Sequence, residues 1–97
     1  MIFVLDASAM IAYLRDEPGA AVVVEALLDP ESKCHAHVLN LCEVYYDFHR
    51  ASSREEAQQA IIDLELVGVV EDANVSAIVW QAAGALKANL RRVSLAD

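Results

Sequence analysis

Three acidic residues of this chain have the type and the placement of metal ligands: Asp6, Glu43 and Asp97. Asp6 directly follows an apolar run, Glu43 falls early in an amphipathic segment, and Asp97 stands where another helix is expected to begin. Carboxylate oxygens suit Mg²⁺ or Mn²⁺ better than Zn²⁺. If these acids converge, an ion that they hold can activate water and stabilise the charge that develops on a phosphodiester during an in-line displacement.

The same three positions also suit the ordinary caps of helices. Asn40 and Glu43, like Ser94 and Asp97, have the spacing of a capping box, in which each side chain accepts a hydrogen bond from the other residue's backbone N–H. Asp6 is a good N-cap residue, and the helix dipole favours acids in first turns. Spacing alone therefore leaves metal binding and helix capping as alternatives.

The elements that would position these acids alternate between short strand-like runs and amphipathic segments. The alternation predicts an α/β domain with a largely parallel sheet, in which strand ends and the following helix starts gather along one edge. Ile2–Leu5 is predicted as an interior strand because both of its faces are apolar. The other predicted strands are Cys34–Val38 and Leu66–Val70; the predicted helices are Ala7–Leu14, Pro18–Leu28, one after an N-cap at Asn40, one beginning at "SSREE", and Asn74–Leu90.

The composition is that of a globular, acidic and unusually apolar chain. Its 97 residues suit one domain, and a hydrophobic content of 57% with a mean hydropathy of +0.33 excludes intrinsic disorder. The net charge of −8 argues against a generic nucleic-acid-binding surface, but it is compatible with a nuclease that has an acidic metal site. The sequence has no basic signal-peptide region and no membrane-spanning run, so we expect a cytoplasmic protein. Much apolar side chain is expected to stay at the surface or to meet a partner.

Taken in order, "FVLDASAMIAYL", "NLCEVYYDFHR" and "RRVSLAD" resemble PIN-domain proteins, especially the VapC-type toxins of bacterial toxin–antitoxin pairs. The resemblance implies a three-layer α/β/α fold with a parallel central sheet. It also implies an endoribonuclease that depends on Mg²⁺ or Mn²⁺, with Asp6, Glu43 and Asp97 as catalytic metal ligands. The implied substrate is structured RNA, and the implied partners are a second copy of the chain and a small VapB-like antitoxin.

Further residues are expected to support such a site. Ser8 matches a small hydroxyl residue of the family and would either orient a metal-bound water or cap the first helix. Asp47 lies one helical turn after Glu43 and is expected on the same flank. Arg91 and Arg92 are close to Asp97 and would either hold RNA phosphates or end a helix as solvated cations.

The chain departs from the family pattern at its end. Members of the family run on beyond the segment like "SLAD" and often carry a fourth acid, so we expect residues 1–97 to be a single domain that lacks the family's C-terminal helix and strands. If the family's sheet order holds, Ile2–Leu5 becomes an exposed edge. The alternative function is then a catalytically incomplete module for dimerisation or antitoxin binding.

Two unrelated readings carry less support from the residues. His35 and His37 share a strand face near Cys34 and Cys42, but their spacing matches no structural zinc pattern, and neighbouring strand residues point in opposite directions. A flavodoxin-like domain that binds phosphate would need a glycine-rich loop, whereas the three glycines here are scattered.

Overall fold

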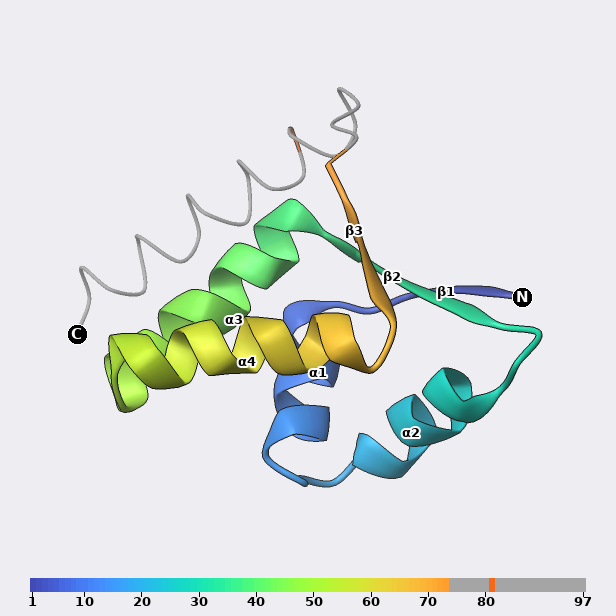
Figure 1. The fold of residues 1–97 in the computed structure, drawn as a ribbon, viewed down its shortest axis with the longest axis horizontal. Helices are drawn as coiled ribbons and strands as arrows, with labels where there is room; N and C mark the ends of the chain where they lie inside the picture. The colour runs from blue at the N-terminus through green and yellow to red at the C-terminus, as the bar shows by residue number, and fades with distance from the viewer. Residues whose placement is uncertain (74–80, 82–97) are drawn as a thin grey trace.

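A computed structural model describes residues 1–73 and Gln81, and over these residues the chain alternates strands with helices (Figure 1). This order confirms the α/β class. None of the helices in the described part is long and apolar enough to span a bilayer. The strands are β1 (Ile2–Val4), β2 (Lys33–His37) and β3 (Val69–Asp72); the helices are α1 (Ala7–Leu14), α2 (Ala20–Leu28), α3 (Val38–Ala51) and α4 (Arg54–Leu66).

The described strands form one parallel sheet in the order β1-β2-β3, within an α/β/α arrangement. Phe3 of β1 pairs with Cys34 of β2, and Cys34 pairs with Val69 of β3. Among the described residues β1 therefore lies at an edge, and Ile2 and Val4 expose 68% and 73% of their surface. The apolar run of β1 predicts an interior strand. Among the described residues, however, β1 pairs only with β2 and so has a neighbour on one side.

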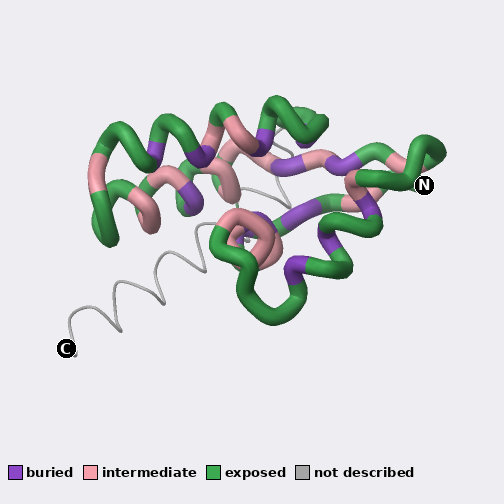
Figure 2. Tube along the Cα trace, turned by 60° about the horizontal axis from the view of Figure 1, so that its bottom comes forward, coloured by how far each residue is buried: buried purple, intermediate pink, exposed green. Residues whose placement is uncertain are grey.

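The core lies where the inner sides of the helices meet the sheet, as the buried segments in Figure 2 show. The helices pack as two pairs, α1 with α2 and α3 with α4, and α1 also packs against α3. Helix α4 buries Ala57, Ala60 and Leu64. Helix α3 is buried less deeply: Val44 is fully buried, while Leu41, Tyr45 and Phe48 are half-buried.

Two element boundaries that differ from the sequence prediction have a glycine as their local cause. Helix α2 begins at Ala20 rather than Pro18, because Gly19 adopts a left-handed conformation with φ of 101°. Strand β3 begins at Val69 rather than Leu66, because Leu66 still belongs to α4. Gly68, with φ of 102°, then ends the helix by donating its N–H to the carbonyl of Glu65.

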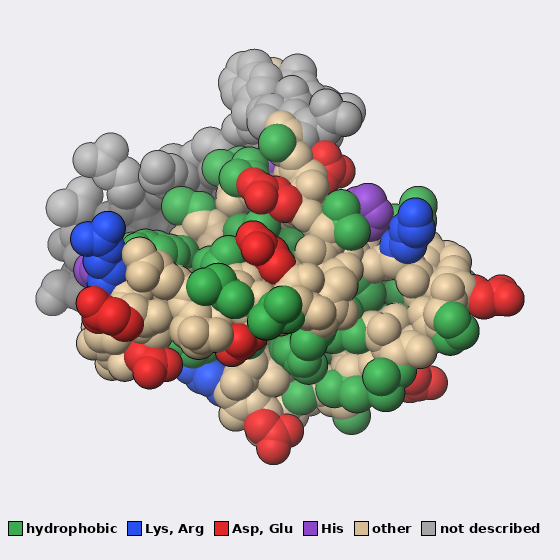
Figure 3. Space-filling model, in the orientation of Figure 1, with side chains coloured by type: hydrophobic (Ala, Val, Ile, Leu, Met, Phe, Trp, Pro, Cys, Tyr) green, Lys and Arg blue, Asp and Glu red, His purple; other side chains and the backbone are tan. Residues whose placement is uncertain are grey.

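Apolar side chains cover much of the described surface, as expected from the composition (Figure 3). Val22 and Leu28 on α2 are 71% and 76% exposed, and they border a shallow apolar groove that reaches Phe3 of β1. The exposed side chains of β1, Ile2 and Val4, lie on the face of the strand opposite to Phe3. Such a large exposed apolar area is typical of a surface that meets a partner.

Candidate metal centre

Asp6 caps helix α1 and still presents a carboxylate oxygen to solvent. Its Oδ1 atom accepts hydrogen bonds from the backbone N–H of Ala9 at 2.8 Å and from the hydroxyl of Ser8 at 2.9 Å. Its Oδ2 atom makes no such contact with any described residue, and the side chain is exposed. The predicted capping role of Asp6 is therefore present, and it occupies one oxygen while leaving the other available to a ligand.

Glu43 is not part of a capping box, which corrects the prediction for the start of α3. The N-cap is His37 rather than Asn40: its Nδ1 atom accepts the N–H of Leu39 at 3.1 Å, and the helix begins at Val38. Glu43 consequently lies in the second turn, beyond the backbone N–H groups that a cap serves. Its side chain is exposed. Helix capping therefore does not explain the acid at position 43.

Asn40, displaced from the cap, makes a contact that the sequence did not reveal. Its Oδ1 atom accepts the backbone N–H of Ala7 at 3.3 Å, so that it joins the first turn of α3 to the first residue of α1. The two residues are 33 positions apart, and spacing along the chain carries no signal for such a bond. It places the helix starts that carry Asp6 and Glu43 next to each other.

The charge balance of the two described acids favours a cation. Neither Asp6 nor Glu43 forms an ion pair with any residue of the described part of the chain. Both follow parallel strands that are neighbours in the sheet, at the edge where ligands of such sheets bind. The third predicted ligand, Asp97, lies outside the described residues. Within residues 1–73 and Gln81, no three His, Cys, Asp or Glu side chains are grouped closely enough to hold a metal.

The residues predicted to support the site fall into three situations. Ser8 donates its hydroxyl to Asp6, so it fixes the orientation of that carboxylate. Asp47 forms an ion pair with Arg15 at 2.8 Å, and it is approached by Arg50 at 3.7 Å, so basic side chains already contact it. Arg91 and Arg92 lie outside the described residues.

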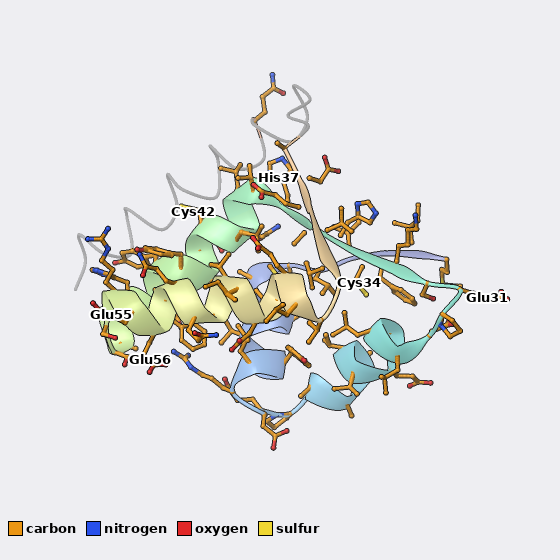
Figure 4. All side chains as sticks on the ribbon, in the orientation of Figure 1. Glu31, Cys34, His37, Cys42, Glu55 and Glu56 are labelled. Carbon is orange, nitrogen blue, oxygen red and sulfur yellow. The ribbon has the colours of Figure 1, made fainter. Side chains whose placement is uncertain are left out.

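The cysteines and histidines that hinted at zinc lie apart in the described structure. Figure 4 shows Cys34 within β2 and Cys42 on α3, with His37 at the junction between these two elements. Cys34 is buried and its burial raises the pKa of the thiol, whereas Cys42 is exposed. A thiol held in the protonated form is a poor metal ligand. These residues therefore give zinc no support.

Comparison with known protein families gives one match. A family model described as "PIN domain" matches residues 3–97, which is nearly the whole chain. No curated protein and no solved structure matches the chain. The match includes the segments that contain Asp6, Glu43 and Asp97.

Proposed function

This chain belongs to the PIN domain family, whose members are generally nucleases that use divalent metals, and from this premise we propose that it is an Mg²⁺- or Mn²⁺-dependent endoribonuclease of the VapC type. The observation that carries the proposal is the state of Asp6. Its carboxylate is oriented by two donors through one oxygen, while the other oxygen is exposed and unpaired by any described residue. Asp6, Glu43 and Asp97 are the proposed ligands.

The donor chemistry fits a hard cation. The proposed ligands are carboxylates, and the two in the described part carry no neutralising Lys or Arg. Oxygen ligands select Mg²⁺ or Mn²⁺, and the bound ion would supply a water of lowered pKa together with compensation for charge on the phosphodiester. The backbone N–H of Ala9 and the Ser8 hydroxyl both donate to Oδ1 of Asp6, so this carboxylate is held in one orientation.

The proposal includes a partner for the apolar surface. VapC-type function implies a homodimer and an antitoxin, and the exposed apolar side chains of β1 and α2 support association of this chain with protein. Sedimentation equilibrium of the purified chain is expected to give the mass of two chains. A monomer at every concentration tested would argue against the homodimer.

The decisive experiment compares two aspartates that accept hydrogen bonds from the same kinds of donor. Asp29, like Asp6, accepts a backbone N–H and a serine hydroxyl, here from Glu31 and Ser32. Asp6→Asn keeps a good N-cap and is expected to stay folded but to lose Mn²⁺-dependent cleavage of transfer RNA. Asp29→Asn is expected to cleave at the wild-type rate. Full cleavage by Asp6→Asn would contradict the metal role.

A further inference from the structure

The side chain of Asn40 connects the two helices that carry the described candidate ligands. The N–H of Ala7, the residue after Asp6, donates to Asn40 Oδ1 at 3.3 Å. Asn40 lies three positions before Glu43 in α3, so the two residues are neighbours on one side of that helix. One hydrogen bond thus joins the residue after the first acid to the helical turn before the second.

The burial of Ala7 makes the loss of this hydrogen bond costly in free energy. The first N–H groups of a helix have no acceptor inside the helix. In α1, Asp6 accepts a hydrogen bond from the N–H of Ala9, whereas Asn40 accepts one from the N–H of Ala7. Ala7 is only 6% exposed, so water is a poor substitute for the lost acceptor. Leaving a buried donor unpaired costs free energy. The bond between Ala7 and Asn40 therefore stabilises the arrangement in which the two helix starts lie together.

A second polar contact joins the end of α1 to a later turn of α3. Arg15, the C-cap of α1, pairs with Asp47 in α3 at 2.8 Å. Between the two contacts lie Met10 of α1 and Val44 of α3, both with no exposed surface. The helices therefore run side by side in the same direction. Their relative position is set at one end by Asn40 and at the other by the ion pair.

We propose that Asn40 is a positioning residue for the metal site: it contacts neither metal nor substrate, and it sets the separation of Asp6 from Glu43. The inference rests on the proposed function, because that separation matters only if both carboxylates bind the same ion. Removing a hydrogen bond made directly to a metal ligand typically lowers metal affinity about 10–100-fold. Asn40 bonds the backbone beside Asp6 rather than a ligand, so we expect a loss at the lower end of that range.

The test measures metal binding rather than activity, in the 97-residue chain. Asn40→Ala is compared with Ser53→Ala, which removes the cap of α4, a hydrogen bond to the N–H of Glu56 at 3.1 Å. Each variant loses one helix-start acceptor, so both are expected to lower the melting temperature by similar amounts. By calorimetry, Asn40→Ala is expected to bind Mn²⁺ about 10-fold more weakly, whereas Ser53→Ala binds it like the wild type. Asn40→Asp retains an acceptor oxygen and is expected to restore most of the affinity.

The outcomes separate this inference from the proposed function. Wild-type chain that binds no Mn²⁺ would overturn the proposed metal site and, with it, any role of Asn40 in that site. Wild-type binding that survives unchanged in folded Asn40→Ala would overturn the positioning role alone. An equal loss of affinity in Asn40→Ala and Ser53→Ala would also overturn it, because general loosening of the fold would then account for the effect.

Discussion

The Nη1 atom of Arg15 lies 2.8 Å from the Oδ2 atom of Asp47, and this ion pair joins the end of α1 to the middle of α3. The Arg15 guanidinium also covers the ring of Phe48, with its central carbon 4.5 Å from the ring centroid. Asp47 Oδ2 is enclosed but has no well-aligned hydrogen bond, so the charge of Arg15 is its main compensation. The placement of Asp47 therefore has an explanation in helix packing, and its support of a metal ligand stays a prediction.

Removing Arg15 should destabilise the fold more than removing an arginine without a partner. Arg15→Ala leaves the enclosed oxygen of Asp47 without its nearest cation and uncovers Phe48, and we expect a loss of about 1 kcal/mol in the free energy of unfolding. Arg54, at the start of α4, makes no ion pair with any described residue, so Arg54→Ala should change stability by less than about 0.5 kcal/mol. Urea unfolding measures both. Equal midpoints for the two variants would show that the pair contributes nothing.

The fold class was predictable because hydrophobic periodicity is a local property. Helix α1 has the predicted bounds, and Ser53 caps α4 within the segment "SSREE", where the sequence predicts a helix start. The end of α4 was missed for a physical reason. The run Leu66–Val70 is apolar throughout and reads as a strand, but the left-handed Gly68 separates the last helical residues from the first strand residues. Its role depends on backbone conformation, which composition does not specify.

The candidate site was predictable in its residues and not in its connections. Asp6 and Glu43 stand out because each follows a strand. The spacing between Asn40 and Glu43 predicts a capping role for Asn40, yet the imidazole of His37 supplies the cap and Asn40 accepts from the backbone of α1. The carbonyl oxygen of an asparagine side chain can accept a hydrogen bond from any of several backbone N–H groups. Which donor it serves depends on the helix packed beside it, and that is decided by tertiary structure.

Two leucines near the end of α4 should respond differently to the same substitution. Leu64 is 1% exposed and belongs to the core, whereas Leu66 is 78% exposed. Leu64→Ala leaves a cavity and should lower the free energy of unfolding by about 3 kcal/mol. Leu66→Ala should change it by less than about 0.5 kcal/mol. Denaturant titrations followed by circular dichroism distinguish the two. A large loss in Leu66→Ala would indicate that this side chain is covered in solution by a partner.

The two cysteines should differ in reactivity toward iodoacetamide. Cys34 is 2% exposed, and burial raises the pKa of its thiol, so little thiolate is present near neutral pH. Cys42 is exposed on α3. Under native conditions at pH 8 we expect modification of Cys42 alone, detected by mass spectrometry of the tryptic peptides. Labelling in urea supplies the control, since both thiols should react there. Rapid native labelling of Cys34 would contradict its burial.

Asp29 should make stability depend on acidic pH in a defined direction. Its pKa is held below the ordinary 3.8 by the backbone N–H of Glu31 first and by the Ser32 hydroxyl second, with hydrogen bonds of 2.9 and 2.8 Å. A lowered folded-state pKa means that the unfolded chain takes up the proton first as the pH falls. The stabilising effect is therefore complete above the unfolded value and is lost as the pH falls through the folded one.

Asp29→Asn should consequently be less stable than the wild type near neutral pH, with the difference shrinking once the pH falls below about 4. Urea midpoints at pH 7, 5, 3.5 and 2.5 would trace this convergence. Asp63→Asn is a suitable control, because among the described residues the Asp63 carboxylate accepts a hydrogen bond from the Gln59 side chain and from no backbone N–H. A difference between wild type and Asp29→Asn that stays constant across the series would show that the carboxylate's hydrogen bonds do not favour its ionised form.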